Sequence, residues 1–219
     1  MVIAIDGPAG SGKTTTAKYV AEKLGFIHIN TGAMYRGIAL KILKKGIDLD
    51  NKNDMEKILF ETIFQFSYKN GSELIMDGVN ISNEIVSSEV TEYVGRISTI
   101  PMVREKLVQY QRNMSEGKDV VLEGRDIGTV VFPNADYKFF LTADIQERAK
   151  RRIQEMKAKG EKVQLKELIH NLEERDRKDT TRKHSPLKKA DGAVEIDTTG
   201  LKIEDQVNCI VEIVNKINK

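Results

Sequence analysis

The sequence predicts an α/β fold built on a five-stranded, mostly parallel sheet. Short apolar runs rich in β-branched residues recur along the 219-residue chain without polar alternation, as in strands buried on both faces. Helical patterns, with apolar residues three and four positions apart, lie between most of these runs. Strands that alternate with helices favour parallel pairing, because each helix can serve as a crossover connection.

The strands of the predicted sheet are five apolar runs, at residues 2–6, 26–29, 120–122, 137–141 and 193–196. The predicted helices, where apolar residues repeat at the helical period, cover residues 14–24, 32–45, 54–66, 103–116, 145–159, 165–175 and 203–217. A glycine-rich segment joins the first strand to the first helix, so the chain opens with a strand, a tight loop and a helix.

A different pattern lies between residues 65 and 85. Short apolar segments lie on both sides of Asn70-Gly71, a pair that favours a two-residue hairpin turn. This segment is therefore predicted to form a small antiparallel sheet inserted into the α/β core. Residues 148–189 are the most charge-dense stretch, with few apolar residues, and part of it is expected to be mobile.

The composition excludes several classes of protein. Thirty-five basic and 33 acidic residues give a net charge of +2, too small for a protein-wide field that attracts nucleic acid. Cys209 is the only cysteine, which excludes an intrachain disulfide and a multi-thiolate zinc site and favours a cytoplasmic setting. No apolar run approaches the ~18 residues of a membrane helix, and the first residues do not resemble a secretion signal.

The strongest motif follows the first predicted strand, where residues 7–14 match G-x-x-x-x-G-K-[ST]. Glycines let successive N–H groups turn toward phosphate oxygens, and the following helix adds its positive end. Lys13 is expected to contact the outer phosphates and Thr14 to ligate Mg²⁺. The predicted site for ATP or GTP comprises Gly7, Pro8, Ala9, Gly10, Ser11, Gly12, Lys13, Thr14 and Thr15.

Several arginines are placed to bind a second phosphate. Arg36 follows the second strand, and Arg125 and Asp126 follow the third core strand, at the sheet edge where open α/β folds bind ligands. The residues at 175, 179 and 182 read Arg, Asp, Arg, and they share one face if the segment is helical. Phosphoryl transfer needs such cations around both anionic reactants. Surface ion pairs remain an equal alternative for residues 174–182.

Taken together, these motifs resemble the bacterial cytidylate kinases, a branch of the nucleoside monophosphate kinases. The resemblance runs nearly end to end and is carried by residues 5–14, 31–36, 124–133 and 174–176 with Asp179 and Arg182. It implies transfer of the ATP γ-phosphoryl group to CMP or dCMP with Mg²⁺, in pyrimidine nucleotide metabolism. It also implies a three-layer P-loop fold: a core at about 1–64, 96–145 and 165–219, an acceptor-binding insertion at about 65–95 and a helical lid at about 146–164.

The resemblance also implies roles for residues at matching positions. The acceptor phosphate would be held by Arg36, Arg125 and Arg182. The sugar would be held by Arg175 and Asp179. Thr31, in the second matching segment, is included among the predicted substrate-binding residues.

On the cytosine edge, the resemblance implies contacts from Arg104 and Asp126. The family has a further serine at the base, just before the segment that contains Arg104. Gly95 occupies the nearest register in this chain and Ser98 lies three residues later, so both positions stay open, with Ser98 as the candidate.

The predicted lid begins with Arg148 and Arg152, which share a helix face and could close over the triphosphate to exclude water. The alternative is a solvated basic face. The residues predicted to act in catalysis are Lys13, Arg125, Arg148, Arg152 and Arg182. No histidine is assigned as a general base, because an acceptor phosphate is already an anionic nucleophile. Glu123, at the end of a strand, is a further candidate for holding magnesium.

Two other functions remain open at this point. One is a kinase for another small acceptor, such as UMP, AMP or a hydroxy acid, on the same core. The other is a P-loop switch or a nucleic-acid-dependent ATPase, against which the near-neutral net charge argues. The expected partners are small-molecule substrates, for a protein that acts as a monomer without nucleic acid or membrane.

Overall fold

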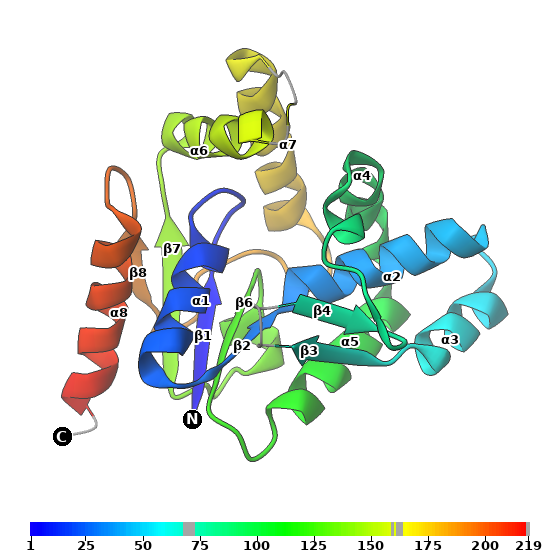
Figure 1. Ribbon diagram of the computed structural model, residues 1–219, viewed down its shortest axis with the longest axis horizontal. Helices are drawn as coiled ribbons and strands as arrows, with labels where there is room; N and C mark the ends of the chain where they lie inside the picture. Colours follow the sequence, from blue (N-terminus) through cyan, green and yellow to red (C-terminus); the bar gives the residue numbers. More distant parts are fainter. Residues whose placement is uncertain (68–72, 159, 161–163, 218–219) are drawn as a thin grey trace. The chain divides into compact units, whose positions relative to one another are not determined.

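The computed structural model describes residues 1–67, 73–158, 160 and 164–217 (Figure 1). These residues form two compact units. Unit 1 comprises Met1–His28 and Gly117–Lys219, and unit 2 comprises Ile29–Glu116. The predicted turn at Asn70-Gly71 lies outside the described residues.

The main sheet has five strands in the order β2-β6-β1-β7-β8, and all of it belongs to unit 1 except the last two residues of β2. The strands are β1 (Val2–Asp6), β2 (Ile27–Asn30), β6 (Val120–Gly124), β7 (Tyr137–Thr142) and β8 (Val194–Asp197). The central strand β1 pairs in parallel with β6 and β7, and β7 pairs in parallel with β8. Ile3, Ala4 and Ile5 are fully buried, so both faces of β1 are covered. The predicted parallel sheet is confirmed.

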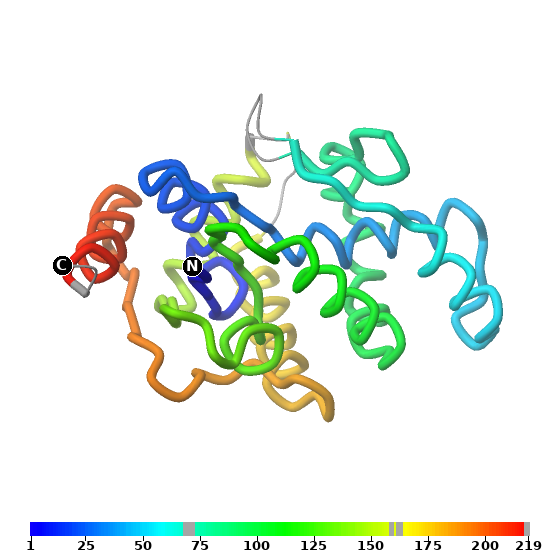
Figure 2. The backbone as a smooth tube through the Cα atoms, turned by 90° about the horizontal axis from the view of Figure 1, so that it is seen from below, coloured from blue at the N-terminus to red at the C-terminus, as the bar shows by residue number. Residues whose placement is uncertain are grey.

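One face of this sheet packs against α1 (Lys13–Leu24) and the C-terminal helix α8 (Ile203–Ile217), which lie side by side in Figures 1 and 2. Ile3, Ile5 and Phe139 of the strands form an apolar core with Val20 of α1 and Ile210 of α8. This burial is the main stabilising contribution in unit 1, since removing apolar surface from water contributes about 25 cal/mol per Å².

The opposite face of β1 is covered by η2 (Ile127–Val131), a single π-helical turn directly after β6. A Cβ built on Gly128 would lie 3.2 Å from the Ala190 Cβ and 3.5 Å from Asp6 Oδ2. A side chain at position 128 would therefore be tightly packed, and its neighbours would have to shift by a few tenths of an ångström. The turn that follows β6 is thereby fixed against the end of β1.

Two more helices complete unit 1, α6 (Ile145–Ala158) and α7 (Leu165–Thr181). Ala149 of α6 and Leu168 and Leu172 of α7 pack around Ala9 of the glycine-rich loop. The expectation that this charged stretch has little apolar surface to dock it is therefore wrong for these two helices. Helix α7 also continues six residues beyond its predicted end at residue 175.

Unit 2 contains a three-stranded antiparallel sheet, β3-β4-β5, as the sequence predicts. Its strands are β3 (Phe64–Ser67), β4 (Glu73–Met76) and β5 (Val79–Asn80). The helices are α2 (Thr31–Lys45), α3 (Lys52–Glu61), η1 (Glu84–Val86), α4 (Ser88–Ile97) and α5 (Pro101–Ser115). Of these, α4 is absent from the sequence prediction.

The predicted helix over residues 54–66 is wrong at its C-terminal end. Helix α3 stops at Glu61, and the next residue, Thr62, is extended. The Thr62 hydroxyl donates to the Ile58 carbonyl at 2.6 Å and accepts a hydrogen bond from Lys41 of α2 at 2.9 Å. Lys41 also pairs with Asp77 at 2.6 Å. These tertiary contacts hold the chain away from the helical path, so that β3 begins at Phe64.

Across the part of the chain that the structure describes, no helix is long and apolar enough to cross a membrane.

Candidate functional site: a phosphate loop and its cations

The glycine-rich loop between β1 and α1 has the backbone that a phosphate cradle requires. Gly7, Gly10 and Gly12 have φ angles of +150°, +76° and +86°, a region that L side chains rarely adopt. At Gly7 a Cβ would lie only 2.1 Å from the Leu141 carbonyl oxygen. Helix α1 then begins at Lys13, which directs its unpaired N–H groups and the positive end of its dipole toward the loop.

Lys13 lies buried within this loop. Its Nζ donates to the Pro8 carbonyl at 2.6 Å and lies 3.4 Å from Ser11 Oγ. Burial, followed by the positive charges of Arg125 and Arg175, places the pKa of Lys13 well below its ordinary value, although Glu123 opposes this. Negative charge at the loop would offset both the burial and the repulsion, so the site favours an anion.

Thr14 and Glu123 provide two oxygen ligands beside the loop. The Thr14 hydroxyl donates to Glu123 Oε2 at 2.9 Å, and Glu123 is buried at the end of β6. The other carboxylate oxygen lies 3.8 Å from Nε2 of His28, a buried residue whose pKa is lowered chiefly by burial. Among the described residues no three His, Cys, Asp or Glu side chains form a metal cluster. The pair suits Mg²⁺, which usually takes one or two protein oxygens and completes its shell with phosphates and water.

A group of arginines surrounds Asp179 in unit 1. Arg125 Nε donates to Asp179 Oδ2 at 2.8 Å, and Arg182 Nη1 lies 3.9 Å from Oδ1. Burial raises the pKa of Asp179, but the charges of Arg125, Arg175 and Arg182 outweigh it, so the pKa lies below its ordinary value. Arg182 follows the last residue of α7 and donates to the Ser185 carbonyl at 2.6 Å. The structure thus brings Arg125, Arg175, Asp179 and Arg182 together.

The segment that carries Arg125 and Asp126 is fixed by Asp6 at the end of β1. Asp6 Oδ1 accepts the N–H of Ile127 at 2.9 Å, and Oδ2 accepts the N–H of Gly128 at 2.8 Å. Burial raises the pKa of Asp6 to about 6, against a partial lowering by these two hydrogen bonds. Asp126 is also buried, and its charge contributes to the raised pKa of Asp6.

The predicted lid arginines have different surroundings. Arg148 is buried, and it donates to the Ala9 carbonyl of the loop at 3.0 Å and to Asp176 of α7 at 2.6 Å. Arg152 instead pairs with Glu155 at 2.7 Å, with 37% of its side chain exposed. For Arg152, the structure therefore shows the solvated, ion-paired face that was the alternative to a lid arginine.

Arg151 also lies beside the phosphate loop, although the sequence analysis did not name it as a site residue. It donates to the Thr198 hydroxyl at 3.0 Å and to the Thr198 carbonyl at 2.6 Å. Its Nη1 lies 3.5 Å from the position of a Cβ on Gly12, and Thr198 Oγ1 donates to the Ser11 carbonyl. The spacing of three from Arg148 could have indicated it, since positions i and i+3 also share a helix face.

In unit 2, Ser98 and Arg104 lie close together. Arg104 is buried, donates from Nη1 to the Ser98 carbonyl at 3.1 Å and lies 5.6 Å from the ring centre of Tyr35. Ser98 Oγ donates to the Gly95 carbonyl, so the two candidate positions for the family serine lie at the same helix end.

Thr31 and Arg36 both belong to α2. Asn30 caps this helix by accepting the N–H of Ala33 at 2.9 Å, and Thr31 is its first residue. The terminal nitrogens of Arg36 lie 3.8 and 3.9 Å from the position of a Cβ on Gly32. The guanidinium group therefore lies at the first turn of α2.

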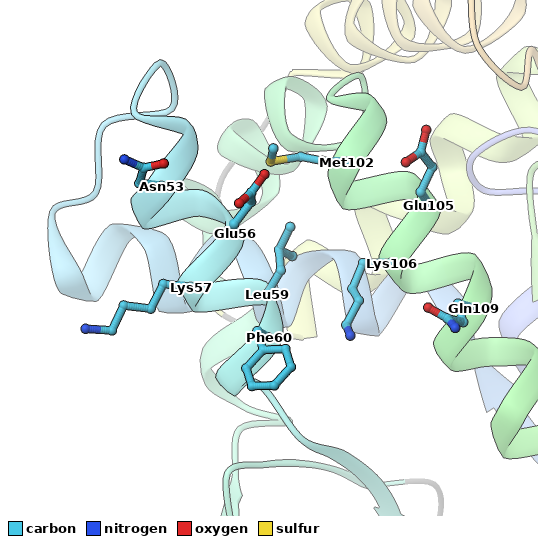
Figure 3. A pocket seen from close by; sticks show the side chains of 9 residues that line it. All are labelled: Asn53, Glu56, Lys57, Leu59, Phe60, Met102, Glu105, Lys106 and Gln109. Atoms are coloured by element: carbon cyan, nitrogen blue, oxygen red, sulfur yellow. The ribbon is translucent and has the colours of Figure 1, made fainter.

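A shallow groove of about 610 Å³ also lies in unit 2, between α3 and α5 (Figure 3). Two acidic and two basic side chains line it, together with Phe60 and Met102. None of the residues predicted from the sequence lines it. Its balanced charge does not match a phosphorylated ligand.

The residues Asn51–Asp54 match the guanine-reading pattern Asn-Lys-x-Asp that a GTP-dependent switch would need. In the structure they begin α3. The Asn51 amide donates to the Asp54 carboxylate at 2.7 Å, and its oxygen accepts the Asp54 N–H. Both polar side chains are therefore used to cap a helix.

The comparisons with known proteins agree with the motifs. Residues 3–216 match the family model of cytidylate kinase. A cytidylate kinase from Fusobacterium nucleatum is 46% identical over 99% of this chain and 98% of its own length, and one from Caldanaerobacter subterraneus is 46% identical over 99% and 96%. An uncharacterized protein from Eubacterium ventriosum, whose structure is solved, shares the fold with a TM-score of 0.54 at 13% identity, covering 98% of both chains. The chain belongs to the cytidylate kinase family.

Proposed function

We propose that this chain transfers the γ-phosphoryl group of ATP to CMP and dCMP, giving CDP or dCDP and ADP. The observation that supports the proposal is the cluster of Arg125, Arg175 and Arg182 around Asp179. Beside burial, the charges of Arg125 and Arg175 lower the pKa of Lys13 in the phosphate loop. A phosphate loop alone would fit any nucleotide-hydrolysing protein. Transfer between two phosphates requires a second group of cations close to the first, so that both anionic reactants are neutralised.

The loop residues support the ATP half of the proposal. Backbone N–H groups of residues 7–14 and the start of α1 would hold the β- and γ-phosphates, with Lys13 as a point charge. The Thr14 hydroxyl and, directly or through water, the Glu123 carboxylate would hold Mg²⁺. The ion would neutralise charge on the triphosphate and orient it.

The acceptor half rests on the arginines. By the family resemblance, Arg36, Arg125 and Arg182 would hold the acceptor phosphate, because guanidinium groups bind phosphate oxygens bidentately without losing their charge. Arg175 and Asp179 would hold the sugar. Arg104, Asp126 and Ser98 would contact the cytosine edge, and Thr31 would be a further substrate contact.

The proposed mechanism needs no protein base. His28 is buried and its pKa is lowered, so it is neutral at physiological pH. The attacking oxygen belongs to a phosphate that is already anionic. What this chain contributes is the position of the two phosphates and positive charge around the transferring group. We expect a monomer that acts in the cytoplasm on small-molecule substrates.

The experiment that tests the proposal is a coupled assay of ADP release with CMP, dCMP, UMP, AMP and GMP at saturating Mg-ATP. We expect kcat/KM for CMP or dCMP to exceed that for AMP and GMP by at least about 10²-fold, because a site that pairs with cytosine leaves polar groups unpaired with a purine. Equal kcat/KM values across the panel would contradict the assignment of the acceptor.

A further inference from the structure

Arg148 connects three segments of unit 1. Its Nε donates to the Ala143 carbonyl at 3.1 Å, which ties it to the loop after β7. Its Nη1 donates both to the Ala9 carbonyl of the phosphate loop at 3.0 Å and to Asp176 of α7 at 2.6 Å. These bonds use the Nε and Nη1 nitrogens of the guanidinium group. The structure records no hydrogen bond from Nη2 to any residue that it describes.

The Asp176 side chain makes its one recorded hydrogen bond, among the residues that the structure describes, to Arg148. Its Oδ2 accepts the 2.6 Å hydrogen bond from Arg148. Its Oδ1 is buried and accepts no hydrogen bond from the residues that the structure describes. A buried carboxylate oxygen without a donor is costly, so the strong charged bond to Arg148 must help to offset that cost. Asp176 has no role in the function proposed above.

We propose that Asp176 is a positioning residue for phosphoryl transfer, which holds Arg148 against the Ala9 carbonyl of the phosphate loop and leaves its Nη2 to contact the ATP phosphates. The inference rests on the proposed function. A guanidinium fixed before ATP binds loses less side-chain freedom when it contacts developing charge in the transition state. Asp176 lies on α7 and Arg148 on α6, so the same bond fixes the two helices beside the phosphate loop.

Asp176→Asn tests the proposal, because it keeps the size of the side chain and removes its charge. We expect kcat to fall by about 10- to 100-fold, with KM for CMP within about twofold of the wild type, since Asp176 acts through Arg148 on the donor phosphates. The matched control is Glu174→Gln, which removes a carboxylate from an exposed Arg177 pair on the same helix. The control should keep the wild-type kcat.

A double-mutant cycle with Arg148→Ala separates positioning from a general effect on structure. If Asp176 acts through Arg148, the double variant should have the same kcat as Arg148→Ala alone. If the two losses in kcat multiply, or if Asp176→Asn has the wild-type kcat, the proposal is wrong. Should the Asn variant lose helical circular dichroism, Asp176→Glu, which keeps the charge, replaces it and should give a kcat above that of Arg148→Ala.

Amide hydrogen exchange of the protein without nucleotide provides a test that is independent of turnover. Exchange in the first two turns of α6 should be faster in Asp176→Asn than in the wild type, and unchanged in Glu174→Gln. Equal exchange in all three proteins would overturn the proposed role. If the wild type fails to phosphorylate CMP, the proposed function is wrong, whereas exchange still decides whether Asp176 holds Arg148.

Discussion

The pH dependence of stability gives a sharp test of the contacts that Asp6 makes. Asp6 is 3% exposed, and burial raises its pKa from 3.8 to about 6. Between pH 3.8 and about 6, the carboxyl group is largely ionised in the unfolded chain but still largely protonated in the folded one. The folded state then binds more protons, so the free energy of unfolding falls as the pH rises.

The perturbation is Asp6→Asn, and the quantity is the difference in unfolding free energy between wild type and variant. At about 1.4 kcal/mol per pH unit, a pKa that rises from 3.8 to about 6 lowers this difference by about 2 kcal/mol between pH 4.5 and 7.5. Any constant cost of the substitution, such as the weakened bond to Ile127 or Gly128, cancels in the slope. Urea titrations at four pH values measure it.

Asp179→Asn is the matched control, because the pKa of Asp179 is shifted in the opposite direction. Burial raises the pKa of Asp179, but the charges of three arginines outweigh burial, so the pKa lies below the unfolded value of 3.8. The ionised carboxylate therefore stabilises the folded state fully above pH 3.8, and this contribution is lost only at more acid pH. The wild-type-minus-variant difference should therefore be flat from pH 4.5 to 7.5. A flat difference for Asp6→Asn as well would refute the argument that its carboxyl group is held in a desolvated position.

Three further predictions concern the phosphate loop and the acceptor. Lys13→Ala should remain folded by circular dichroism, yet lose about 10²–10³-fold in kcat, because a charge on the transferring phosphates is gone. Gly7→Ala should lower the free energy of unfolding by about 1–3 kcal/mol, since its Cβ would lie 2.1 Å from the Leu141 carbonyl oxygen, whereas Gly25→Ala, with a positive φ but nothing within 4 Å, should lose less. Arg104→Gln should raise KM for CMP at least about tenfold and leave KM for ATP within twofold, as initial-rate kinetics would show.

Much of the fold was predictable because its signals are local. The strands of the parallel sheet are buried on both faces, which leaves unalternating apolar runs such as Val2–Asp6. The phosphate loop follows from the spacing of its glycines and Lys13. Helix α4 was missed, although its signal was present in Val90, Val94 and Ile97, buried residues at spacings of four and three.

Other features depend on contacts between distant positions. Apolar residues at 64 and 66 extend the helical spacing of α3, but the hydrogen bond from Lys41 to Thr62 stops the helix earlier. The bond between Arg148 and Asp176 joins positions 28 residues apart. No sequence pattern predicts either contact. For the candidate site, the motifs located the residues, while the role of each of them in binding or catalysis stays a prediction.

The fate of the γ-phosphoryl group tests phosphoryl transfer to CMP most directly. The protein is incubated with γ-³²P-labelled ATP, Mg²⁺ and CMP, and the products are separated by chromatography. We predict that label appears in CDP, in a one-to-one ratio with ADP and with little inorganic phosphate. Label released as inorganic phosphate at the same rate with and without CMP would contradict it.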